Sequence, residues 1–324
     1  MAPHTRRTAL VAAVAASTLL VPISAAAAVS DDRSGRRAAT CRSARDPELA
    51  ARMSKDLRAA LSSRRGTVSL AVHDDNSDLW CALDGARRYD SASVAKVLIM
   101  ETVLRRAQEL RRHLTRFEAR NVRPMITSSD NGAALRLWQD LGHQRLQSYL
   151  RKAGARSTTP GPYGLWGLTR TTAADQMRLL GVLSKAPSIL RERARGLKLM
   201  SQVRPGQRWG VPAGRPRGVV AHLKNGWLPR ATHGWRVHSV GVFTGAGRNY
   251  RIVALSHDNP TMAYGVRTIE RIAHAVHRGL NKGRAAGTDY TPESEISEQS
   301  DGSVPEGLPD DFELPEEPSH DDGA

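Results

Sequence analysis

The spacing of hydrophobic residues predicts a helix and two strands in the first part of the chain. Residues 46–62 begin with aspartate, proline and glutamate, which are favoured at an N-cap, at the first helical position and in the first turn. Residues 67–72 and 79–83 are rich in strand formers and flank 74–78, which has the composition of a turn. We therefore expect a helix followed by two strands.

A hydrophobic run begins directly after Ser93. It comprises Val94 and residues 97–100 and covers all sides of the first two turns of a helix that we expect to end near Arg112. Such a pattern is typical of a helix in the centre of a domain. Lys96 lies inside the run, three positions after Ser93, so the two side chains share one face of the helix.

The remainder of the chain is first helical and then strand-like. Residues 115–153 have helical spacing with short breaks, 156–170 form a loop rich in Gly and Pro, and further helices are expected at 172–185 and about 188–202. The later segments are three strands and a closing helix, at 219–224, 235–243, 250–256 and 262–280.

This order of elements predicts an α/β fold of the α+β type. Both ends of the domain, 46–85 and 215–282, supply strands to one antiparallel sheet flanked by the terminal helices. Residues from about 93 to 205 form a separate helical lobe. A cleft is expected between the two lobes, where binding sites commonly lie.

The ends of the chain differ in composition from this domain, which spans 46–288. Residues 1–28 combine a positive start, a short hydrophobic core and small residues, which are typical of a signal peptide. Residues 29–45 are polar and are expected to be loose, and 289–324 are expected to be a disordered acidic tail. We expect a secreted, extracellular protein, also associated with the cell wall. A lipid anchor is not expected, because no cysteine closely follows the cleavage point.

The cysteines agree with export. Cys41 precedes the first helix and Cys81 lies in a predicted strand, and an oxidising space favours a disulfide between them over two buried thiols. Two cysteines are too few for a structural zinc site. We expect neither metal nor cofactor, because the histidines lack metal-ligand spacing: His222, His233, His238 and His257.

Charge is unevenly distributed along the chain. The formal net charge is +16, yet residues 289–324 contain 13 Asp and Glu and no Lys or Arg. The body is therefore strongly basic and is expected to adhere to anionic polymers, which outside a cell are those of the wall. Nucleic acid is not an expected partner, because aromatic residues are few and are not interleaved with the basic ones. A monomer is expected.

Ser93 and Lys96 are candidates for covalent chemistry. Burial of an ammonium is costly and lowers its pKa, which turns a lysine into a base for a neighbouring serine. The alternative is that Ser91 or Ser93 caps the helix while Lys96 extends to solvent. A lone Ser-x-x-Lys is common, so the choice depends on motifs further along the chain.

Two such motifs follow in order, Ser129-Asp130-Asn131 and, on a late strand, Lys224-Asn225-Gly226. With Ser93-x-x-Lys96 they form a triple that resembles the serine β-lactamases and penicillin-binding peptidases, most closely the class A β-lactamases. The resemblance spans most of residues 46–280. It implies a serine hydrolase that forms an acyl-enzyme with a β-lactam or a peptidoglycan-derived substrate.

The resemblance also implies a role for each residue. Ser93 is the nucleophile with Lys96 as its base, Ser129 relays the proton to the leaving nitrogen, and Lys224 holds Ser129 and attracts the substrate's carboxylate. The remaining positions bind substrate: Asn131 at its side-chain amide, the strand residues Asn225 and Gly226, and Trp227, whose N–H forms the oxyanion hole with that of Ser93.

Each of these motifs also has an ordinary explanation. Ser129 and Asp130 can cap a helix, Asn131-Gly132 can form a turn, and Lys224 can be an exposed strand lysine.

The chain also departs from the family in three ways. Residues 154–174 contain no Asp or Glu, where class A enzymes carry the Glu that activates the deacylating water; asparagine replaces a hydroxyl at 225; and only 36 residues separate Ser93 from Ser129.

We therefore expect acylation of Ser93 with poor deacylation. A DD-peptidase-like wall enzyme is one alternative, because peptidases of this fold deacylate without that Glu. A binder of β-lactam or peptidoglycan that does not turn over is another, and a basic wall-adhering protein without chemistry is a third.

Overall fold

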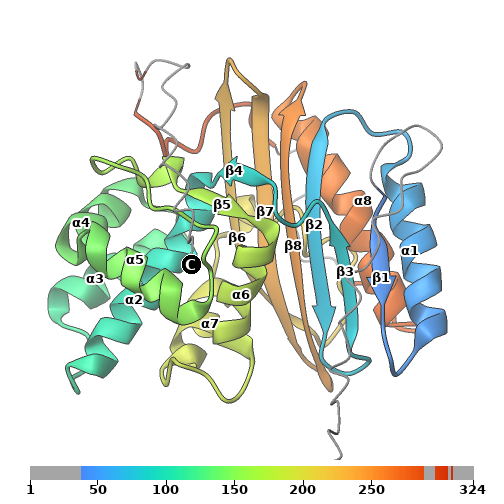
Figure 1. The fold of residues 1–324 in the computed structure, drawn as a ribbon, viewed down its shortest axis with the longest axis horizontal. Coiled ribbons are helices and arrows are strands. Elements are labelled where there is room, and N and C mark those ends of the chain that lie inside the picture. The colour runs from blue at the N-terminus through green and yellow to red at the C-terminus, as the bar shows by residue number, and fades with distance from the viewer. Residues whose placement is uncertain (1–37, 288–295, 306–307, 309–324) are drawn as a thin grey trace, which may run out of the picture.

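The computed structural model describes residues 38–287, 296–305 and 308. Its centre is a six-stranded antiparallel sheet in the order β1-β3-β2-β8-β7-β6, in which strands from both ends of the domain pair through β2 and β8 (Figure 1). The strands are β1 (Thr40–Arg42), β2 (Thr67–Asp74), β3 (Leu79–Leu83), β6 (Val220–Arg230), β7 (Gly234–Gly245) and β8 (Arg248–Asn259).

Two terminal helices cover one face of this sheet. They are α1 (Pro47–Leu61) and α8 (Met262–Leu280), which pack against each other and lie to the right of the sheet in Figure 1. Each begins at a side-chain cap, Asp46 for α1 and Thr261 for α8. Their hydrophobic sides bury one of the two cores together with the sheet.

A helical lobe covers the opposite face and forms the left half of Figure 1. Its helices are α2 (Ala95–Glu109), α3 (Arg116–Thr127), α4 (Asn131–Leu141), α5 (His143–Ala153), α6 (Ala173–Ser184) and α7 (Arg193–Ser201). Helix α2 runs through the middle of this lobe, and every residue from Ala95 to Leu104 is buried. Helix α6 joins the lobe to the sheet by packing on β2 and β8.

A short ribbon connects the two parts near the start of α2. Strand β4 (Arg88–Asp90) pairs with β5 (Arg170–Thr172) and leads into the 3-10 turn η1 (Ala92–Val94). Two further 3-10 turns, η2 (Trp166–Leu168) and η3 (Pro205–Gln207), lie in the long connections. The ribbon places η1 beside η2 at the boundary between sheet and lobe.

The structure confirms the predicted fold class, with one antiparallel sheet, flanking terminal helices and a helical lobe. The disulfide between Cys41 and Cys81 is present and links directly opposed residues of β1 and β3. Strands β6, β7 and β8 are longer than predicted, because the pairing of β7 with both neighbours continues beyond the segments of clear alternation. The sequence did not predict β1, β4 or β5, which have three residues each.

The predicted terminal segments have mixed outcomes. The expected signal peptide, 1–28, lies outside the described residues. Within 29–45, strand β1 and the first residue before it belong to the folded domain, so this part is not loose. The expectation of a disordered tail is wrong for residues 296–305, which pack against the domain, as described below. Among the described residues, no helix combines the length and hydrophobicity needed to cross a membrane.

Candidate active site

Ser93 and Lys96 lie at the junction of η1 and α2. Lys96 Nζ donates a hydrogen bond of 2.9 Å to Ser93 Oγ, and neither side chain has exposed surface. The capping alternative is excluded, because neither the residue before η1, Ser91, nor the residue before α2 makes a side-chain cap. Lys96 therefore points into the protein and not to solvent.

The second motif joins α3 to α4 and brings two more residues, Ser129 and Asn131, to Lys96. Ser129 has a φ of +58°, a conformation rarely adopted by a non-glycine residue, and this turn presents both its carbonyl and its hydroxyl to Lys96 Nζ, at 2.7 and 2.9 Å. Asn131 Oδ1 lies at 2.7 Å from the same Nζ and is a further acceptor for it. Asp130 is the N-cap of α4, and Asn131 opens that helix, so it does not form a plain turn.

Lys224 enters from strand β6 on the opposite side. Its Nζ donates to Ser129 Oγ at 3.0 Å and to its neighbour's carbonyl, and its side chain has no exposed surface, so it is not an exposed strand lysine. Ser129 Oγ also lies 3.1 Å from Ser93 Oγ. The four residues predicted to carry the chemistry thus form one continuous hydrogen-bonded network.

Gly226 allows this network to form. A Cβ at this position would lie 2.6 Å from the Ser93 nitrogen and 2.8 Å from the Val94 nitrogen, closer than atoms can approach. Only glycine therefore lets β6 lie directly against η1. The close approach brings the backbone N–H of Trp227 next to that of Ser93.

Asn225 does not face the cleft, contrary to the prediction that it contacts substrate. Its amide nitrogen donates to the carbonyls of Gln207 and Trp209, at 2.9 and 3.0 Å, and the side chain is 1% exposed. Successive side chains on a strand point to opposite sides, so Lys224 faces the site while Asn225 holds η3 and the residues that follow it.

The two lysines share one buried environment. Burial lowers the pKa of Lys96 well below its usual value, and the nearby charge of Lys224 lowers it further. Burial also lowers the pKa of Lys224, to about 7. An uncharged amine at Lys96 can accept a proton from Ser93, which is the arrangement of an activated nucleophile and its base.

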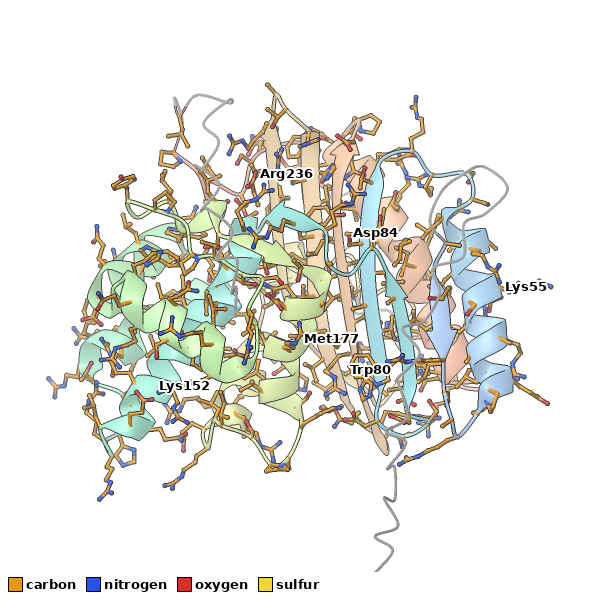
Figure 2. All side chains as sticks on the ribbon, in the orientation of Figure 1. Lys55, Trp80, Asp84, Lys152, Met177 and Arg236 are labelled. Carbon is orange, nitrogen blue, oxygen red and sulfur yellow. A yellow bond between two sulfur atoms is a disulfide. The ribbon has the colours of Figure 1, made fainter. Side chains whose placement is uncertain are left out.

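Three further groups at the site were not found from the sequence. The ring of Trp166, from η2, lies under Lys96, with Nζ 4.6 Å from the ring centroid. Asp90, the last residue of β4, pairs with Arg236 at 3.0 Å; Figure 2 labels Arg236 near the end of the sheet. Asp301 is the third, and its carboxylate Oδ2 accepts hydrogen bonds from the N–H groups of Ser93 and Trp227, at 3.0 and 3.2 Å.

Sequence signals for these three residues are weak. Trp166 lies in a loop without periodicity, and Asp301 belongs to a stretch with the composition of a disordered segment. Asp90 lies shortly before Ser93, but its arginine partners, Arg170 and Arg236, are distant in the sequence.

Among the residues that the structure describes, a cluster outside this site has the residue types of a metal site. Ligand atoms of His233, His257 and Asp258 lie within 4.8 Å of one another. Both carboxylate oxygens of Asp258 are already paired, one with each imidazole Nδ1, at 3.0 and 2.7 Å. Burial lowers the pKa of His257 to about 4. These contacts account for the cluster as hydrogen-bonded pairs.

Comparison with known proteins agrees with this geometry. A sequence model of the beta-lactamase enzyme family matches residues 119–280, half of the chain. The chain belongs to the beta-lactamase enzyme family. The matched range contains Ser129 and Lys224 and begins after Lys96.

Two curated proteins similar to this chain, one from Mycobacterium tuberculosis and one from Mycobacterium bovis, are each named "Putative lipoprotein LppW". Each is 31% identical over 197 residues, which is 58% of this chain and 62% of the relative. The match therefore spans less than two thirds of the relatives' length.

Solved structures with the same fold include class A β-lactamases. A class A β-lactamase from Bacteroides cellulosilyticus superposes with a TM-score of 0.63 at 16% identity and covers 72% of this chain and 98% of its own. An ancestral class A β-lactamase gives 0.60 at 21% identity, with 69% and 98% covered. The structure of PBP-A gives 0.60 at 19% identity, with 72% and 97% covered.

Proposed function

We propose that the protein is an exported serine hydrolase that forms an acyl-enzyme on Ser93 with a β-lactam or a peptidoglycan-stem amide. The observation that carries this proposal is the network in which Lys96 Nζ and Ser129 Oγ both lie within hydrogen-bonding distance of Ser93 Oγ. A structural serine and lysine need not lie beside a second serine and a second lysine, all buried at a lobe boundary.

Acylation follows from these positions. Uncharged Lys96 takes the proton of Ser93 as its Oγ bonds to the carbonyl carbon, and the carbonyl oxygen takes up the negative charge facing the N–H groups of Ser93 and Trp227. The C–N bond then breaks. The leaving nitrogen receives the proton of Ser129, which regains one from Lys96, and Lys224 in its charged form attracts the substrate's carboxylate.

Deacylation is proposed to be slow. Hydrolysis of the ester needs a base to activate water, and residues 154–174 supply no carboxylate. The side chain of this loop that contacts Lys96 is Trp166, and an indole nitrogen is a donor only. The same observation favours the two related alternatives, a DD-peptidase-like wall enzyme and a binder that remains acylated.

An extracytoplasmic location fits several features. The leader sequence, the Cys41–Cys81 disulfide and the lipoprotein relatives all suggest it. We propose that the basic body associates with anionic wall polymers and that the protein acts as a monomer without nucleic acid, metal or cofactor.

The test is to incubate the mature protein with a fluorescent penicillin and follow its intact mass over time. We expect an adduct that persists for many minutes and is absent in Ser93→Ala. Ser91→Ala is the matched control, because Ser91 is an equally buried serine two positions away whose hydroxyl contacts only backbone carbonyls. An adduct that forms equally on Ser93→Ala refutes the proposal, and rapid turnover refutes slow deacylation.

A further inference from the structure

Residues 296–305 of the acidic tail lie across the candidate active site. This segment, part of the red stretch in Figure 1, returns to the domain after the chain has left α8. Asp301 Oδ2 occupies the point on which the N–H groups of Ser93 and Trp227 converge. That point is where the developing oxyanion of an acyl donor must lie.

The backbone of the segment is bound as well. The Asp301 N–H donates to the Trp227 carbonyl at 3.1 Å, and the Asp301 carbonyl accepts from Asn131 Nδ2 at 2.8 Å. Trp227 Nε1 donates to the Gln299 carbonyl at 2.7 Å. The segment is thus held to Trp227 of β6 by its backbone as well as by the Asp301 carboxylate, and it uses a side chain, Asn131, that we assign to substrate binding.

The two ends of the segment are fixed to the domain. Upstream, both carboxylate oxygens of Glu298 accept hydrogen bonds from the first N–H groups of α8, those of Met262 and Ala263, at 2.7 and 2.9 Å. Downstream, Ser303 is 3% exposed, and its carbonyl is packed so closely on Gly167 that a Cβ there would lie 2.3 Å away. The segment is therefore seated at three points.

The turn after Asp301 depends on glycine. Gly302 has a φ of +67°, and a Cβ at this position would lie 2.8 Å from Asn131 Nδ2. Asp301 Oδ1 closes the turn by accepting from the Ser303 N–H at 2.9 Å. One carboxylate oxygen thus shapes the segment while the other faces Ser93.

The charges of segment and site are complementary. Asp301 is among the groups that oppose the lowered pKa values of both Lys96 and Lys224, which places its negative charge within the field of both amines. Ser93, Lys96 and Lys224 have no exposed surface in this arrangement, so an acyl donor cannot reach Ser93 while the segment is in place.

We propose that residues 296–305 are an intramolecular inhibitor of this site, with Asp301 in the position of the substrate's oxyanion. This inference rests on the proposed function. Only molecules in which the segment is displaced can be acylated. The apparent rate of acylation is therefore the rate of the open form multiplied by the fraction of molecules that are open. A tethered ligand acts at a high effective concentration, so weak contacts are enough to keep the site closed.

The first test is Asp301→Ala in the full chain, with the second-order rate of acylation by fluorescent penicillin as the readout. We expect an increase of about tenfold or more, the result of releasing a site that is about nine-tenths closed. Asp310→Ala is the matched control, because it removes the same charge from the same tail. A rate that is unchanged, or that falls, overturns the inference.

A second variant leaves the charge intact. Gly302→Ala opposes the left-handed turn and meets Asn131, so it too should raise the acylation rate. Gly247→Ala is its control, because Gly247 also has a positive φ, +73°, but a Cβ there would have no neighbour within 4 Å. An increase in both variants relative to their controls supports displacement of the segment, whereas an increase in neither contradicts it.

Amide hydrogen exchange separates the two proposals. Exchange at Ser93 and Trp227 should be faster in Asp301→Ala and Gly302→Ala than in the controls, because Asp301 accepts from both amides. Faster exchange without acylation of any variant refutes the proposed function but retains the inference. Acylation with unchanged exchange retains the function and refutes the inhibitor.

Discussion

Gly226 sets the distance between the strand that carries Lys224 and the turn that carries Ser93. Because a Cβ there would lie 2.6 Å from the Ser93 nitrogen, even the smallest side chain must push β6 away from η1. The displaced atoms include the Trp227 N–H, and loss of one oxyanion donor typically costs about 3–4 kcal/mol of transition-state stabilisation.

Gly226→Ala should therefore reduce the acylation rate at least about a hundredfold. The free energy of unfolding should fall by only about 1–3 kcal/mol. Gly181→Ala is the comparison, because it lies inside α6 with open space around its Cβ position and should not lower stability. Fluorescent-penicillin kinetics and thermal unfolding measure the two effects. An acylation rate in Gly226→Ala equal to that of the wild type would refute this account of the oxyanion hole.

At the level of elements, Glu118 is a buried carboxylate that joins two helices of the lobe. It completes a capping box with Thr115 at the start of α3 and pairs with Arg106 of α2 and with Arg112, at 2.7 and 2.6 Å. Burial raises its pKa, but the hydrogen bonds from Arg112, Thr115 and Arg106 prevail and lower the pKa to about 2. The stability that Glu118 contributes is thus present above pH 4.5 and is lost as pH falls toward 2.

Glu118→Gln should lower the stability of the protein by about 3 kcal/mol at pH 7, because two arginines lose their buried partner. The difference from wild type should shrink as pH is lowered from about 5 to about 2. Glu109→Gln on α2 removes a more exposed glutamate paired with Lys152 and should cost less than about 1 kcal/mol. Thermal unfolding followed by circular dichroism across this pH range checks both. If the difference in stability between wild type and Glu118→Gln did not change with pH, the stability would not be linked to the protonation of Glu118.

The elements differ in how far the sequence could predict them. Helix α2 was predictable because its first turns are hydrophobic on all sides, and α8 because a threonine cap and an amphipathic pattern mark its length. Strands β1, β4 and β5 are too short to show periodicity, and their pairing partners are distant in the chain. Ser93, Lys96, Ser129 and Lys224 could be proposed from motif order. Asp301 could not, because its contacts depend on the folded cleft and its own composition indicates disorder.

Charge distribution is a property of the whole molecule. The formal net charge of +16 includes 13 acidic residues in 289–324 without any Lys or Arg, so the folded body carries a large excess of positive charge. Such a surface attracts polyanions through forces that salt screens, with a Debye length of about 8 Å at physiological ionic strength and about 3 Å at 1 M.

We therefore expect the protein to co-sediment with purified anionic cell wall at about 50 mM NaCl and to be released well below 1 M. Co-sedimentation across a salt series measures this. Wall material stripped of its anionic polymers is the control and should retain little protein at any salt concentration. Retention at 1 M NaCl would show that binding is not electrostatic.

The β4–β5 ribbon has a consequence for how ligands enter and leave. Asp90 of β4 pairs with Arg170 of β5, and Ser91 donates a backbone hydrogen bond to Thr169 at 2.8 Å, so the strand before the nucleophile is tied to the loop that carries Trp166. A swing of that loop would pull the nucleophile out of alignment. These contacts hold the loop in place on one side of Ser93. In the proposed mechanism of inhibition, ligands therefore reach and leave Ser93 through displacement of residues 296–305.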